Sequence, residues 1–157
     1  MSRLRILEEE RRRPKRMPFE EREKLLNVIK HVLESREEIE LVVVYGGFIE
    51  SEVFRDIDIA IYTSHRIGID KAPEYVFMLK DMLEKTTGLC VDIHLLDYAP
   101  PGFVYNVLRH GRILIEKHVG TSSILRIHAL EDLRRLNKNQ AKTIQSPVNK
   151  RKQTHHQ

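Results

Sequence analysis

A short apolar run, Leu41 to Tyr45, constrains the fold of this chain more than any other segment. The run is continuous and rich in valine, and a run of this length and composition is typical of a strand buried on both faces. It ends abruptly at Gly46-Gly47, as expected where the chain turns. A buried strand needs neighbours in a sheet and covering elements on that sheet, which favours a fold of helices packed on strands.

Strand and helix patterns alternate along the rest of the chain. Further strands are predicted at Asp56–Tyr62, Leu89–Leu96 and Arg112–Glu116. Apolar periodicity and helix-starting prolines predict helices at 18–36, 73–87, 102–109 and 122–138. The total length of 157 residues suits one domain. We therefore expect a single α+β or α/β-like domain built on a four-stranded sheet.

The second predicted strand begins with two acids, Asp56 and Asp58, separated by one residue. Side chains at i and i+2 of a strand project to the same side, with Cα atoms about 7 Å apart. Two such carboxylates repel each other, and a packed face makes them costly unless a cation lies between them. Magnesium prefers oxygen ligands and commonly needs only one or two carboxylates. Such a pair alone also occurs at strand starts without any metal.

A third acid, Asp92, lies in the middle of another apolar strand. If its strand is adjacent to that of Asp56 and Asp58, three carboxylates converge, and such a group can hold two metal ions. Gly46-Gly47 exposes backbone N–H groups that can cradle phosphates. This ordered combination favours a metal site. No second His or Cys has the spacing of a zinc site with His94, so we expect a hydrogen-bonded histidine in the wall of the site or at an interface.

These motifs resemble those of the minimal nucleotidyltransferases of the DNA polymerase beta superfamily. The family pattern is an apolar strand, Gly-Ser, a linker, D-x-D, a helix, and a third aspartate in a strand. The matching positions here are Gly46-Gly47, Asp56, Asp58 and Asp92. The likeness covers roughly residues 25–138. It implies the polymerase-beta-type fold, a small mixed four-stranded sheet with helices packed on it.

The resemblance also implies an activity, the magnesium-dependent transfer of a nucleotidyl group, AMP, from ATP or another NTP to an acceptor hydroxyl. In that activity Asp56, Asp58 and Asp92 bind the metal and catalyse, while Gly46 and Gly47 approach the nucleotide phosphates. Members of the family often pair with a helical HEPN-domain toxin and modify a tyrosine of that partner.

The sequence departs from the family pattern close to the expected phosphates. Gly47 replaces the family's serine, and the linker before D-x-D is shorter and carries Glu50 and Glu52. Ser51 and Arg55 are the candidates to supply the missing hydroxyl and cation to the nucleotide. The alternative function is therefore a catalytically weak or inactive protein of the same fold that acts as an antitoxin-like binding partner.

Charge is distributed unevenly along the chain. Residues 1–16 carry a net charge of +4 and residues 134–157 a net +7, whereas residues 17–133 carry −7. Residues 1–16 and 139–157 lack apolar periodicity, so we expect a disordered arm and tail around a domain at 17–138. Basic ends suit solvated tails, an acidic partner or nucleic acid, but no known nucleic-acid-binding motif supports the last.

The remaining composition limits the environment of the protein. Cys90 is the only cysteine, which excludes an internal disulfide and fits a reducing cytoplasm. No window approaches 18 uncharged apolar residues, and no secretory signal precedes the first helix. We expect a cytoplasmic protein without a membrane partner, and the sequence leaves its oligomeric state open.

Overall fold

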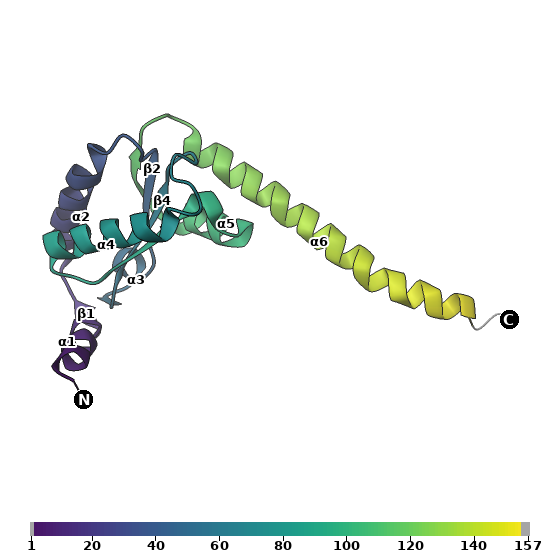
Figure 1. The fold of residues 1–157 in the computed structure, drawn as a ribbon, viewed down its shortest axis with the longest axis horizontal. Helices are drawn as coiled ribbons and strands as arrows, with labels where there is room; N and C mark the ends of the chain where they lie inside the picture. Colours follow the sequence, from purple (N-terminus) through teal and green to yellow (C-terminus); the bar gives the residue numbers. More distant parts are fainter. Residues whose placement is uncertain (1, 155–157) are drawn as a thin grey trace.

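The computed structural model describes the backbone of residues 2–154 and the side chains of residues 2–142 (Figure 1). Its elements are α1 (Arg3–Arg11), β1 (Lys15–Arg16), α2 (Phe19–Glu34), β2 (Leu41–Tyr45), α3 (Gly47–Glu50), β3 (Val53–Phe54), β4 (Ile57–Tyr62), α4 (Ala72–Thr87), β5 (Val91–Leu95), the 3₁₀ helix η1 (Leu96–Tyr98), α5 (Pro101–His110), β6 (Arg112–Glu116) and α6 (Thr121–Thr154). Within the described residues, no helix combines the length and hydropathy needed to span a bilayer.

Four strands form a mixed sheet in the order β5-β4-β2-β6. Strand β2 is antiparallel to both of its neighbours, whereas β4 and β5 are parallel. Parallel neighbours need a crossover connection, and α4 supplies it between β4 and β5. The α+β class and the mixed four-stranded sheet expected from the sequence and the resemblance are both confirmed.

Each face of the sheet is covered by a pair of helices. Helices α2 and α4 pack on one face, where the core includes Leu26, Ile29, Leu79 and Leu83 together with Ile57, Ile59 and Ile61 of β4. Helix α5 and the first turns of α6 pack on the other face, where Val104, Val107 and Ala129 meet Val43 and Ala60. The alternation along β4 therefore points its isoleucines to α2 and α4, and leaves Asp58 on the side of α5.

The N-terminal segment differs from the disordered arm predicted for residues 1–16. Residues 3–11 form α1, whose first turn is capped by Ser2 and which buries none of its own residues. Arginine, leucine and glutamate are good helix formers, so this short helix needs little packing. Lys15 and Arg16 then pair antiparallel with Phe54 and Val53. Whether the predicted domain 17–138 folds without this segment stays a prediction.

The C-terminal segment also differs from the expected disordered tail. The helix predicted at 122–138 is α6, which continues to Thr154 and leaves the domain body as a long arm (Figure 1). Lysine, glutamine and alanine after residue 137 have high helix propensity, so the backbone stays helical although apolar residues become sparse. Residues 155–157 of the predicted tail lie outside the described residues.

A buried acid next to the sheet makes the stability of this fold depend on pH. The Glu40 carboxylate accepts hydrogen bonds at 2.7 Å from His118 and from Arg66. The hydrogen bond from His118, followed by the Arg66 pair, outweighs burial and lowers the pKa of Glu40 below its usual 4.5. An acid with a lowered folded-state pKa contributes stability above its usual pKa, and that contribution is lost as the pH falls through the folded-state pKa.

We expect Glu40→Gln to destabilise the protein by about 1–3 kcal/mol at pH 7, because a buried charged hydrogen bond is weakened. Below pH 4.5 the difference between variant and wild type should shrink, since wild-type Glu40 becomes protonated there. Thermal melts from pH 3 to pH 7 measure this. Glu37→Gln, on an exposed side chain, is the control. A Glu40→Gln difference that does not change with pH would contradict the assignment.

Candidate active site

A row of three polar side chains crosses the sheet on the face that carries α5. We call it the acid row, and its members are Tyr45, Asp58 and Asp92. Tyr45 of β2 lies directly opposite Asp58 of β4, and Asp58 lies directly beside Asp92 of β5. The three residues come from three adjacent strands, and the alternation of each strand turns them to one side. The sequence-predicted adjacency of the Asp58 and Asp92 strands is therefore observed.

Asp58 lies in an environment that disfavours the ionised form of its carboxyl group. Burial, followed by the negative charges of Asp92 and Asp56, raises the pKa of its carboxyl to about 6 against an opposing effect of His94. Burial, followed by the negative charges of Asp58 and Asp92, also raises the pKa of the Tyr45 phenol. The row thus holds unneutralised negative charge in a half-buried place, where a cation would be stabilising.

Asp56 and Asp92 flank Asp58 from more open positions. Asp56 precedes the first residue of β4 and is half-buried, and the side chain of Asp92 is 52% exposed. Asp92 Oδ2 lies 3.0 Å from His94 Nε2, so His94 is hydrogen-bonded, as the sequence predicts. The His94 ring also lies against Phe103 of α5, with centroids 5.2 Å apart.

The paired glycines follow β2 directly and begin α3. Gly46 has a φ of +77°, a conformation that other residues rarely adopt, and its carbonyl accepts the first hydrogen bonds of α3 from Ile49 and Glu50. A Cβ on Gly46 would collide with Oδ2 of Asp58, so only glycine lets the backbone pass this close to the acid row. A Cβ on Gly47 would make only ordinary contacts, at 3.5 Å or more.

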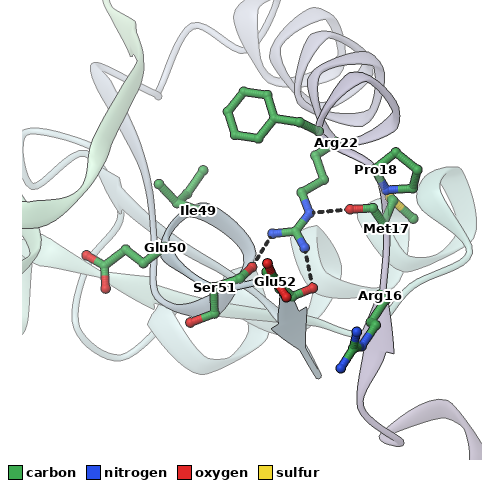
Figure 2. A pocket seen from close by; sticks show the side chains of 9 residues that line it. Arg16, Met17, Pro18, Arg22, Ile49, Glu50, Ser51 and Glu52 are labelled. Carbon is green, nitrogen blue, oxygen red and sulfur yellow. Dashed lines mark hydrogen bonds between the residues drawn. The ribbon is translucent and has the colours of Figure 1, made fainter.

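Arg22 of α2 holds the segment after α3, and the sequence analysis did not select it. Its guanidinium donates to the carbonyls of Phe48 at 2.9 Å, Ser51 at 2.6 Å and Glu52 at 2.6 Å, while its Nε donates to Met17 at 3.0 Å. Figure 2 shows Arg22 reaching from the helix to the carbonyls of Met17, Ser51 and Glu52. The side chain is 6% exposed. An arginine on the same helical stripe as Leu26 and Ile29 was the available signal.

Two hollows adjoin the chain around α3, and Glu50 lines both of them. One, of about 400 Å³, is lined by Tyr45, Gly46, Glu50, Phe103, Asn106 and His110 and adjoins the acid row. The other, of about 520 Å³, contains Arg22 and Ser51 (Figure 2). Ser51 lines this second hollow, and its backbone N–H donates to the carbonyl of Gly47 at 2.9 Å. Its contact with the nucleotide stays a prediction. Arg55 is exposed, and its side chain has no hydrogen bond or ion pair within the described residues.

An apolar groove of about 560 Å³ reaches the acid row from the other direction. It runs beside the edge strand β5 and is lined by Ile69, Val76, Leu95, Tyr98, Pro100 and Phe103, and it includes His94, the partner of Asp92. Ile69 at its rim is 70% exposed. The hollow at Gly46 adjoins the acid row through Tyr45, and this groove adjoins it through His94.

A family comparison matches this arrangement of strand, glycines and acids. The model of the family described as polymerase beta nucleotidyltransferase matches residues 27–119, more than half of the chain. This chain belongs to the polymerase beta nucleotidyltransferase family. No curated protein sequence matches it at a significant level.

Solved structures share the fold of this nucleotidyltransferase. The toxin–antitoxin complex MntA–HepT contains a chain with 16% identity and a TM-score of 0.61, and the match covers 80% of this chain and 98% of that one. A tri-AMPylated Shewanella oneidensis HEPN toxin in complex with MNT antitoxin matches with 16% identity and a TM-score of 0.63, over 81% of this chain and 98% of that one. A toxin–antitoxin structure with AMP-PNP matches with 17% identity and a TM-score of 0.64, over 78% of this chain and 98% of that one.

Two of the three sequence-predicted metal-binding acids, Asp58 and Asp92, are direct neighbours in this family member. Within the described residues, no group of three or more His, Cys, Asp or Glu side chains could hold a metal ion, which corrects the expected convergence of three carboxylates. Asp92 is exposed and bonded to His94, and Asp56 lies before the strand. Asp58 and Asp92 remain as adjacent oxygen donors. Magnesium bound to a nucleotide needs only one or two carboxylates, because phosphate and water supply the other oxygens.

Substitution of the two glycines is expected to affect stability differently. We expect Gly46→Ala to destabilise by about 1–3 kcal/mol, from the positive φ and the collision with Asp58. We expect Gly47→Ser, which restores the family's serine, to leave the melting temperature within error, because its Cβ has room. Thermal melts of both variants measure this. Equal melting temperatures would contradict the role assigned to Gly46.

Proposed function

We propose that this protein is a magnesium-dependent nucleotidyltransferase that moves AMP from ATP, or a nucleotidyl group from another NTP, to a hydroxyl of a protein acceptor. The observation that carries the proposal is the row of Asp58 and Asp92 on parallel neighbouring strands, next to a glycine turn that only glycine can form. The proposed acceptor is a tyrosine of a HEPN-type toxin. A structural neighbour, a tri-AMPylated HEPN toxin in complex with MNT antitoxin, supports this choice.

In this proposal the residues of the chain divide into two groups. The backbone N–H groups of Gly46 and Gly47 approach the triphosphate, and the adjacent carboxylates of Asp58 and Asp92 would hold the magnesium bound to it. Asp92 faces the acceptor. Bound magnesium would neutralise charge on the phosphates and on the leaving group. Arg22 positions α3 and the segment after it through the carbonyls of Phe48, Ser51 and Glu52.

The proposed reaction is one displacement at the α-phosphorus. The acceptor hydroxyl oxygen forms a bond to that phosphorus, and the bond from the phosphorus to the bridging oxygen breaks, which releases pyrophosphate. The hydroxyl proton passes to the Asp92 carboxylate, which is exposed and can deliver it to water. His94, at 3.0 Å from Asp92, holds that carboxylate in place before the acceptor arrives.

The groove beside β5 supports a polypeptide acceptor. It is lined mostly by apolar side chains and begins beside His94, so an apolar or aromatic side chain of a partner could bind next to Asp92. A sugar or an RNA would find few polar groups there. The edge of β5 also carries no further strand within the described residues, which leaves it open to an extended segment of a partner.

The test is label transfer from α-labelled ATP to a purified HEPN-type partner in magnesium. We expect label on a partner tyrosine, and none after EDTA. Ile69→Glu at the exposed rim of the groove should reduce transfer while nucleotide affinity is unchanged. Glu74→Gln, outside the groove, is the control. Absence of transfer to any protein acceptor would overturn the proposed activity.

The alternative is that the same fold acts as an antitoxin-like binding partner with weak or no catalysis. Two observations favour it: the exposed Glu50 lines the hollow at Gly46, and an oxygen of Asp92 is already bonded to His94. Tight binding to a HEPN-type partner without transfer of label would select this alternative. Replacing Glu50 by Gln should then not create transfer activity.

A further inference from the structure

The distal part of α6 is a helix without a core to pack on. Its first turns contact α5 through Leu125, Ala129 and Leu133. After Leu133, every described side chain is exposed up to Lys142. Figure 1 shows this part of α6 projecting away from the sheet and its covering helices. The segment therefore does not serve the stability of the domain.

This exposed part of α6 carries a row of cations. Arg134, Lys138 and Lys142 follow one another at intervals of four residues, which places them on one face of the helix about 6 Å apart along its axis. Like charges at this spacing destabilise a helix. Arg135 is paired with Asp132 at 3.2 Å, but the three residues of the row have no ion pair within the described part of the chain. A row of this kind is stabilised when an anionic ligand lies along it.

The sequence that surrounds the row indicates the class of anion. No Asp or Glu follows Asp132, and the last aromatic residue of the chain is Tyr105. All four glutamines and three asparagines occur after residue 136. Protein interfaces depend on buried aromatic, methionine or arginine anchors, whereas phosphate backbones are bound by Lys and Arg together with Asn and Gln.

We propose that the distal part of α6 binds the phosphodiester backbone of a nucleic acid, without reading its sequence. Arg134, Lys138 and Lys142 contact successive phosphates, and the amide side chains nearby donate further hydrogen bonds. The body of the domain, with a net charge of −7 over residues 17–133, repels the same ligand and confines it to the arm. This site is separate from the acid row and does not depend on the proposed transfer reaction.

The test uses the full chain and two fluorescent probes, a single-stranded RNA and a DNA duplex of the same sequence. We expect binding of at least one probe that weakens steeply from 50 to 200 mM salt. The triple variant with Arg134, Lys138 and Lys142 changed to Gln should bind at least about tenfold more weakly at 50 mM. The slope of log K against log salt should fall by about 2 for RNA and about 3 for the duplex.

The matched control changes Lys24, Lys30 and Lys71 to Gln, three exposed cations of the body, for the same change in net charge. Its affinity and slope should stay close to those of the wild type. Equal losses in the two triple variants, or no salt-dependent binding by the wild type, would overturn the proposal. An α6 variant that keeps nucleic-acid affinity but loses a protein partner would also overturn it, because the cations would then serve a protein interface.

Discussion

Asp58→Asn is expected to raise the melting temperature of the metal-free protein and to abolish its stabilisation by magnesium with ATP. The first effect follows from the pKa of about 6 that burial and the charges of Asp92 and Asp56 impose on Asp58. An acid with a raised folded-state pKa costs stability when it is ionised at neutral pH, and an amide of the same shape removes that cost. The half-exposed position of Asp58 makes the gain smaller than for a fully buried acid.

The second effect follows from the loss of a magnesium ligand. We expect the affinity for ATP in magnesium to fall at least about 100-fold. Calorimetry with ATP and magnesium, repeated in EDTA, measures this. Wild type should bind ATP weakly in EDTA, because the acid row repels a triphosphate. Asp81→Asn, on an exposed face of α4, is the control. A variant that melts lower than wild type and still binds ATP with magnesium would show that Asp58 has a structural role instead.

Arg22→Met is expected to cause the largest loss of stability of any substitution discussed for this protein. The guanidinium is buried and donates to four backbone carbonyls, and it lies 5.0 Å from the ring of Phe54. Methionine preserves most of the packing but leaves those carbonyls without a donor. A buried hydrogen bond from a charged group contributes about 1.5–3 kcal/mol, so we expect a loss of at least about 3 kcal/mol.

Thermal and urea unfolding of Arg22→Met measure this loss. Lys24→Met, at an exposed cation of the same helix, should change little and serves as the control. Arg22→Lys keeps the charge but cannot donate to all four carbonyls, so it should be intermediate in stability. If the lysine variant is folded, its weaker ATP binding would show that Arg22 positions the segment after α3. Unchanged stability of Arg22→Met would contradict this role.

Much of the fold could be predicted because its signals are local. The valine run of β2, the alternating residues of β4, and Gly88, which ends α4 with a φ of 71°, each follow from backbone preferences within a few residues. The pairing of Asp58 with Asp92 was predicted through the same alternation, on the condition that their strands were neighbours.

The ends of the chain were predicted less well, for a related reason. Both α1 and the distal part of α6 are helical without an apolar stripe against a core, so periodicity could not reveal them. Helix propensity was their only local signal. The pairing of β1 with β3 joins two-residue segments that are far apart in the chain. A strand of two residues is too short to show a sequence pattern, so this pairing could not be predicted.

The sequence by itself determined the four strands of the main sheet, the glycine turn and the three acids, because periodicity and turn chemistry act over short distances along the chain. Only the tertiary structure decided how those parts meet. It placed Arg22 on the carbonyls of Ser51 and Glu52, and it placed Asp58 of β4 beside Asp92 of β5. Each of these depends on the packing of segments distant in sequence, where a shift of one residue changes which side chains touch.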